Sequence, residues 1–313
     1  MNQSVKLSGW RYRVLIGSAV CSALVYLALS LWGGGAAVSA AVSRVGGWEA
    51  GKIIGLVLLG YGLRFLRWQV YLNALRHPMP WWPSLKIYLA GFALTTTPGK
   101  AGEALRGVLL KRWDVPYVHS FAALFSERLS DLLGIVALAL LGLSAHPEWL
   151  SMIVACLVLL ACCMLLVSRS GLVSAIDRRI EHRHGWFSRL LRHCVHVLHQ
   201  SRSCHTPGRQ IGATLLSVLA WGLEGLAFYW ILLAMKADVT LISAIFIYAV
   251  SMLAGALSFM PGGLGSAEAV MVGLLVSDGV GLPDSIAATV LLRLVTLWLA
   301  VGLGAVMFVD IKQ

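Results

Sequence analysis

Several charged residues of this sequence lie within or beside long apolar stretches, where a charged side chain is costly. Such residues are by default either tightly paired or functional. Arginine and lysine bind phosphate and carboxylate groups, whereas aspartate and glutamate pair with those cations or exchange protons. The candidate site residues are Lys100, Glu103, Arg106, Glu127, Arg128, Asp131, Glu224, Glu268 and Arg293.

Two interpretations of the first group of charges stay open at this stage. Glu103 and Arg106 are three positions apart, as are Arg128 and Asp131, so two ion pairs can form within single helices. The alternative is an anion site, because Lys100 joins Arg106 and Arg128 at one break in the apolar pattern. That is more polar chemistry than packing requires.

The remaining buried charges suggest different roles. Glu268 and Arg293 stand almost alone in their apolar stretches, so pairing between them is the simplest interpretation. Glu224 has no cation nearby in the sequence and is a candidate for proton coupling, although a neutral, hydrogen-bonded core glutamate is the commoner outcome. Arg64 and Arg67 lie near the end of an apolar stretch and are expected to reach outward to headgroups.

The composition excludes a water-soluble enzyme. Of 313 residues, 58% are hydrophobic and 12% charged, against roughly 25% charged in soluble domains, and the mean hydropathy is +0.80. Apolar stretches recur from end to end, which predicts a single all-α polytopic membrane domain over residues 1–313. The net charge of +11 is expected to set orientation in the membrane, and nucleic acid is not an expected partner.

About six apolar stretches are long enough to cross a bilayer as helices. They alternate with short loops, and the basic loops fall on one side, which places both termini in the cytoplasm. The predicted location is the bacterial inner membrane, with several passes. The stretches are Val14–Trp32, Gly51–Leu72, Val118–Leu143, Trp149–Ser168, Ile211–Met235 and Ile286–Val309.

Two further apolar regions are each interrupted by a Pro-Gly break, which predicts re-entrant helical hairpins. Ser84–Thr97 and Gly102–Leu110 flank Pro98-Gly99, and both limbs are shorter than a spanning helix. Unpaired backbone groups at such a break are tolerated only against protein or a wet cavity. The second break, at Pro261-Gly262-Gly263, follows Leu241–Met260, which is long enough to span, so a full crossing remains open there.

The two breaks belong to an internal repeat. Each begins with Pro-Gly and closes with Glu-Ala, and an arginine follows the glutamate 25 residues later in both copies. The modules cover residues 84–143 and 241–309. An odd number of crossings separates them, which predicts an inverted repeat of the kind that places transporter sites where the copies meet.

Residues 169–209 form the most basic segment and are predicted to be a cytoplasmic loop. Apolar residues in 186–198 follow helical spacing with basic residues between them, which is typical of an amphipathic helix on the inner leaflet. The helix is interpreted as a surface anchor or as a direct collector of anionic lipid. The histidines here and the six scattered cysteines have no recognised ligand spacing, so neither a metal nor a cofactor is expected.

With these motifs, the sequence resembles the flippase-like membrane family named after the transmembrane region of lysylphosphatidylglycerol synthase. The likeness covers about Val14 to Val309. The segments that carry it are Ala90-Gly91-Phe92, residues 98–106 (PGKAGEALR), residues 127–133 (ERLSDLL) and residues 261–269 (PGGLGSAEA).

The resemblance implies a lipid flippase or scramblase that moves an anionic phospholipid or a polyprenyl-phosphate-linked lipid between leaflets. Fused members carry a soluble aminoacyl-transferase domain, whereas this chain ends at Gln313, so it is not expected to synthesise lysyl lipid or to be an enzyme. The implied partners are membrane lipids with anionic headgroups and enzymes of envelope lipid or glycan synthesis. The alternatives are an intramembrane enzyme acting on lipid phosphates and a non-catalytic scaffold.

Overall fold

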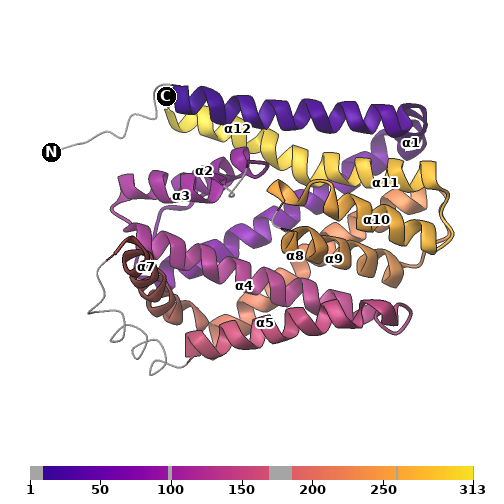
Figure 1. The fold of residues 1–313 in the computed structure, drawn as a ribbon. Helices are drawn as coiled ribbons and strands as arrows, with labels where there is room; N and C mark the ends of the chain where they lie inside the picture. Colours follow the sequence, from indigo (N-terminus) through magenta and orange to yellow (C-terminus); the bar gives the residue numbers. More distant parts are fainter. Residues whose placement is uncertain (1–9, 98–100, 169–184, 259, 313) are drawn as a thin grey trace.

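A computed structural model of the chain describes residues 10–97, 101–168, 185–258 and 260–312. These residues form helices and connecting loops without any strand, arranged as an elongated bundle (Figure 1). The α-helices are α1 (Trp10–Ala74), α2 (Trp81–Ala90), α3 (Ala101–Leu110), α4 (Tyr117–Gly142), α5 (Leu150–Ser168), α7 (Trp186–Ser201), α8 (Pro207–Ala234), α9 (Leu241–Leu257), α10 (Ser266–Ser277), α11 (Leu282–Arg293) and α12 (Leu299–Lys312).

Four helical segments of the described chain are long and apolar enough to span a membrane: Val38–Ala74, Pro147–Val167, Pro207–Ala234 and Leu282–Ile311. A multi-pass membrane protein is therefore confirmed, while the count of six spans stays a prediction. The 26-residue α4 has sufficient length, about 39 Å at 1.5 Å per residue, but carries several charges.

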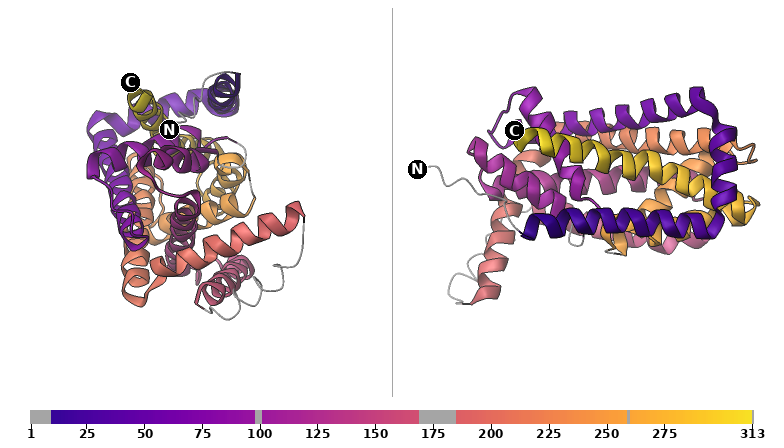
Figure 2. Two further views of the ribbon diagram at one scale, coloured as in Figure 1. Left: turned by 90° about the vertical axis from the view of Figure 1, so that its left-hand side faces the viewer. Right: turned by 90° about the horizontal axis from the view of Figure 1, so that it is seen from above.

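Helix α1 contains the first two predicted spans and bends between them. Its 65 residues are all helical except for a local break at Gly46, whose φ of 67° is left-handed. Figure 2 shows the two arms running along the bundle with a short transverse stretch between them. The predicted gap between the two spans is therefore helical.

Two hairpins of short helices form at the predicted breaks. Helices α2 and α3 flank the first, and α9 and α10 flank the second; the hairpins enter from opposite ends of the bundle (Figure 1). With 17 residues, α9 is about 26 Å long, shorter than a typical span.

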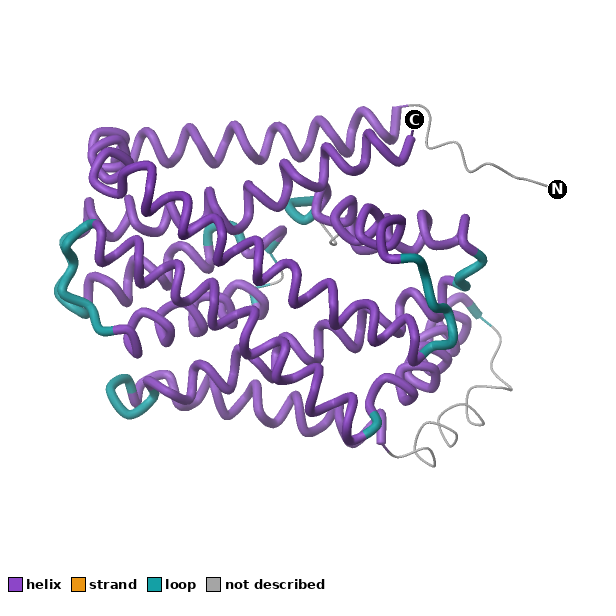
Figure 3. The backbone as a smooth tube through the Cα atoms, turned by 180° about the vertical axis from the view of Figure 1, so that it is seen from behind, coloured by secondary structure: helices purple, strands orange, loops and turns teal. Residues whose placement is uncertain are grey.

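The tips of these hairpins meet inside the bundle. A Cβ atom at Gly262 would lie 3.7 Å from the Thr95 carbonyl oxygen and 3.7 Å from the Thr96 Cα atom, which is ordinary contact distance. In Figure 3 the tips are short loop segments in the interior, whereas the other loops lie toward the ends of the bundle. At the second break, Gly262 is therefore packed against protein, as unpaired backbone at membrane depth requires, whereas Pro98 and Gly99 of the first break lie outside the described residues.

The connections around the two hairpins have matching backbone caps. Arg76 and Lys236, 160 positions apart, are left-handed with φ of 63° and 61°. Asp114 and Gly279, 165 positions apart, also have positive φ, at 57° and 89°. The matching cap bonds run from His77 to Leu72 and Ala237 to Leu232, both 3.0 Å, and from Val115 to Leu110 at 3.2 Å and Val280 to Leu275 at 2.9 Å.

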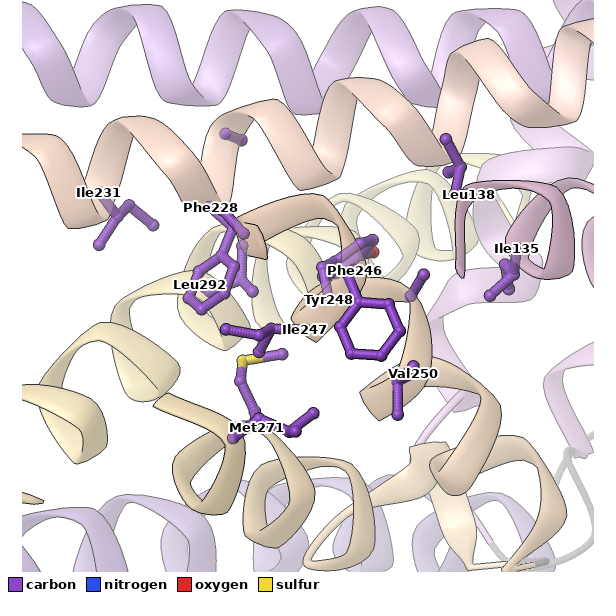
Figure 4. Packing of buried hydrophobic residues seen from close by; sticks show 14 of the residues in the cluster. Ile135, Leu138, Phe228, Ile231, Phe246, Ile247, Tyr248, Val250, Met271 and Leu292 are labelled. Carbon is purple, nitrogen blue, oxygen red and sulfur yellow. The ribbon is translucent and has the colours of Figure 1, made fainter. Parts of the chain in front are cut away.

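Helix α9 lies at the centre of the apolar core. Most of its residues are buried and they are apolar on every face, which is typical of a helix surrounded by others. Figure 4 shows Phe246 and Ile247 packing among Phe228 of α8, Met271 of α10 and neighbouring side chains of the cluster. The second hairpin is therefore fixed along its length.

Candidate functional site

Arg106 and Glu127 form a buried ion pair between α3 and α4. The Arg106 Nη1 atom donates to Glu127 Oε2 at 2.7 Å, and the side chains are 5% and 1% exposed. The guanidinium stacks on Tyr88, with 4.5 Å from Cζ to the ring centroid, and also faces Trp68 and Phe92. Cation–π contact and an ion pair together compensate its desolvation.

Gly91 gives Arg106 the space for this position. A Cβ atom at Gly91 would lie 2.4 Å from Arg106 Nε, a separation that real side chains do not adopt. Among the described residues, Arg106 Nε and Glu127 Oε1 are buried without a hydrogen-bond partner. The pair is therefore held by packing as much as by its bonds.

Asp131 is the hub of a second group that joins α1, α4 and α8. It accepts from Arg67 Nη1 at 2.6 Å and from Trp221 Nε1 at 3.0 Å. The Arg128 Nη2 atom lies 3.4 Å from its other oxygen, Oδ2. Arg67 also donates to the Ser217 hydroxyl. The predicted pairing of Arg128 with Asp131 within one helix is confirmed, and a second cation from α1 shares the carboxylate.

Glu224 is also paired with an arginine of α1. The Arg64 Nη1 atom lies 2.7 Å from Glu224 Oε1, and its guanidinium lies over Trp221 with 4.1 Å from Cζ to the ring centroid. The Tyr248 hydroxyl of α9 donates to Glu224. This group therefore ties α1, α8 and α9 together.

The expectation that Arg64 and Arg67 reach outward to headgroups is wrong. Their side chains are 12% and 1% exposed, because Glu224 and Asp131 on neighbouring helices provide the opposite charges that make burial tolerable. The sequence contained two signals for this pairing. Arg64 and Arg67 lie about one turn apart in an apolar stretch, and Glu224 has no cation nearby in the sequence.

An ion pair between Arg293 and Glu268 holds the break of the second hairpin. Arg293 Nε donates to Glu268 Oε1 at 2.6 Å, which confirms the predicted pairing. Arg293 Nη2 donates to the Gly262 carbonyl at 3.1 Å, and Glu268 Oε2 accepts from the Gly265 amide at 2.7 Å, capping α10. The pair thus satisfies backbone groups that the Pro-Gly break leaves open.

Arg128 differs from the other described arginines of the candidate set because its side chain is 44% exposed. It lies 11 positions after Tyr117, the first residue of α4, or about 16 Å along the helix axis. That distance along α4 is close to half the thickness of a roughly 30 Å hydrocarbon core. An exposed cation at this height needs a wet or charged environment.

Two candidate residues lie outside this geometry. Lys100 falls outside the described residues, and Glu103 lies in α3 with its side chain outside the described part. No group of three or more metal-ligating side chains occurs in the part of the chain that the structure describes. The described site is therefore an assembly of ion pairs with one exposed arginine.

These features define the class of the protein: a polytopic helical membrane protein with broken helices and charges in its interior. Residues 14–304 match the family described as "Lysylphosphatidylglycerol synthase TM region". Because the match covers most of its length, the chain belongs to that family.

Curated relatives carry a family name without a stated activity. A "UPF0104 membrane protein" of Methanothermobacter thermautotrophicus is 26% identical over 76% of this chain and 78% of the relative. A Pyrococcus horikoshii protein with the same family name is 23% identical over 82% and 86%. A shorter match to an M. thermautotrophicus protein, 36% identical, covers 29% of this chain and 28% of the relative. These relatives are archaeal.

Proposed function

We propose that this protein moves an anionic lipid, a phospholipid or a polyprenyl-phosphate-linked lipid, between the leaflets of its membrane. The observation that carries the proposal is the exposed Arg128 side chain at mid-height of α4. A solvated or headgroup-bound arginine there lowers the cost of a phosphate crossing the hydrocarbon core, because it provides the opposite charge. Membrane family membership is consistent with this role.

The site would lie between two inverted modules, residues 84–143 and 241–309. Support comes from the entry of the hairpins at opposite ends, the contact of Gly262 with Thr95 and Thr96, and the matching caps. In such a design the half-helices meet near the midplane, where a polar substrate rests. Six spans and two re-entrant hairpins complete the proposed topology.

The buried pairs would position the site, whereas Arg128 would contact the headgroup. Arg106 and Arg293 are already bonded to carboxylates, so a phosphate must compete with Glu127 or Glu268 to reach them. That competition would prevent a headgroup from being held too tightly for release. Lys100 and Glu103, which follow the first Pro-Gly break in the sequence, would complete the substrate-binding set.

The hydrocarbon tails would remain outside the charged interior. Leu257 and Met260, beside the second tip, are exposed apolar residues and provide a surface for acyl or prenyl chains. Only the headgroup would enter the polar region, so the free-energy barrier to crossing would come mainly from the charge of the headgroup.

Glu224 is proposed as the residue that couples transport to protons. The ion pair of its carboxylate with Arg64 and the hydrogen bond that it accepts from Tyr248 connect three helices, so protonation would weaken the contact between α1 and α8. Translocation by Glu224→Gln should lose any dependence on an imposed pH gradient. A gradient response equal to that of the unaltered protein would remove Glu224 from this role.

Orientation follows from the distribution of charge. Arg76, Lys111 and Arg112 are exposed at the end of the bundle that carries the α3–α4 connection, whereas Asp278 and Asp284 lie at the other end. We propose that the basic end of the bundle and both termini face the cytoplasm, because cytoplasmic loops carry an excess of Lys and Arg. The membrane would be the inner membrane of a bacterial cell.

The test is translocation of headgroup-labelled phosphatidylglycerol in proteoliposomes, with labelled phosphatidylcholine as the comparison lipid. We expect faster transfer of the anionic lipid, slowed by Arg128→Ala and by Arg106→Ala. Equal rates in both variants would remove these residues from the mechanism. Chemical turnover of a labelled lipid phosphate would instead favour an intramembrane enzyme.

A further inference from the structure

Helix α7 (Trp186–Ser201) belongs to none of the ion-pair groups and lies across one end of the bundle. Both views in Figure 2 show it running transverse to the long helices. It packs on α4 and α5, and Ser188 and Val195 are buried on the side that faces the bundle. Its axis is therefore parallel to the plane of a membrane that the long helices cross.

The opposite face of α7 exposes an apolar stripe. Trp186, Leu190 and Cys194 are spaced four apart and lie on one side of the helix, and Trp186 and Leu190 are 72% and 52% exposed. Arg189 and His193 are exposed beside this stripe. An apolar stripe with basic flanks is the pattern of a helix that lies in a bilayer surface.

The same end of the bundle has other features of a membrane interface. Helix α2 begins there with Trp81 and Trp82, which are 63% and 59% exposed, and α3 is followed by Trp113, which is 45% exposed. Exposed tryptophans beside basic residues such as Lys111 and Arg112 mark the headgroup level. The stripe of α7 thus lies at the end where headgroups are expected.

We propose that α7 docks on the membrane surface by inserting Trp186 and Leu190 while Arg189 binds anionic phosphate headgroups of that leaflet. A lipid surface is favoured over a protein partner because the helix is transverse, lies at the tryptophan level, and has basic flanks. The inference stands apart from the proposed lipid transfer, since docking needs no translocation.

The test uses Cys194, which is exposed on the stripe, as the site of an environment-sensitive fluorophore. The other five cysteines are replaced by serine, and the full chain is placed in nanodiscs of phosphatidylcholine alone or with phosphatidylglycerol. We expect blue-shifted emission that brominated lipids quench, and stronger quenching with phosphatidylglycerol. The Arg189→Glu variant should reduce that extra quenching severalfold.

Lys236→Glu provides the matched control, because Lys236 is exposed at the opposite end of the bundle. It should leave the emission and quenching unchanged, and gel filtration should show that both variants stay monodisperse. Emission typical of water in both kinds of nanodisc would overturn the proposal. So would quenching that is equal in the two lipid mixtures and insensitive to Arg189→Glu. Each outcome is read independently of any translocation rate.

Discussion

The two helical hairpins differ in the charged residues that lie beside them. In the second, Arg293 bonds with Glu268 and the Gly262 carbonyl, so one arginine ties the break to the helix that follows. In the first, the pair of Arg106 and Glu127 lies beside an exposed Arg128. Arg293 is therefore buried where it ties the second break, whereas Arg128, at the corresponding position of the first module, is exposed and paired with Asp131.

The largest expected effect comes from removing the carboxylate that Arg67 and Arg128 share. Asp131→Ala leaves Arg67 buried with no acidic partner, which should cost about 3–5 kcal/mol of stability. Thermal unfolding in detergent measures it, with Glu148→Ala as the exposed control. A stability loss no larger than that of the control would show that the first-module network is dispensable.

A somewhat smaller effect is expected in the second module. Arg293→Gln removes the pair with Glu268, which is 16% exposed, so the loss should fall near the lower end of about 3–5 kcal/mol. We expect the unfolding temperature to fall, and translocation to fall only in proportion to the folded fraction. A stable variant with no translocation would assign Arg293 a direct role and remove the contrast between hairpins.

Gly91→Ala tests the packing that places Arg106. Because the new Cβ would lie 2.4 Å from Arg106 Nε, the guanidinium must move from its aromatic neighbours, at an expected cost of about 1–3 kcal/mol. Gly55→Ala is the matched control, because nothing lies within 4 Å of its Cβ position. Equal unfolding temperatures for the two variants would contradict the close approach.

The smallest expected effect is the pH dependence of stability that arises from His77, in the connection that precedes the first hairpin. Burial, with a smaller contribution from His119, lowers the pKa of His77, and the matching position in the second module is Ala237. The folded state therefore binds this proton less well than the unfolded state. Stability is fully present above the ordinary pKa of about 6.5 and declines as pH falls below it.

Unfolding temperatures at pH 7.5 and 5.5 measure this difference. The unaltered protein should lose about 1–2 °C more than His77→Ala over that interval. An equal loss in both proteins would show that other groups set the pH dependence.

The sequence predicted what is local, and it left open what joins distant helices. The Pro-Gly sequences predicted both breaks in the apolar pattern. Because Glu268 and Arg293 stand almost alone in their apolar stretches, the sequence also predicted the bond between them. Hydrophobic periodicity does not tell which helices are neighbours. The bonds of Arg64 with Glu224 and of Arg67 with Asp131 join α1 to α8 and α4, so they required the tertiary arrangement.

If Arg128 contacts an anionic headgroup within the membrane, lipid transfer must depend on the charge at this position, and a series of substitutions there measures that dependence. Arg128→Lys and Arg128→Gln are compared for phosphatidylglycerol transfer in proteoliposomes, each normalised to folded protein. We expect near-normal stability in both, because the side chain is exposed, with transfer largely retained in Arg128→Lys and strongly reduced in Arg128→Gln. Transfer by Arg128→Gln at the rate of the unaltered protein would contradict it.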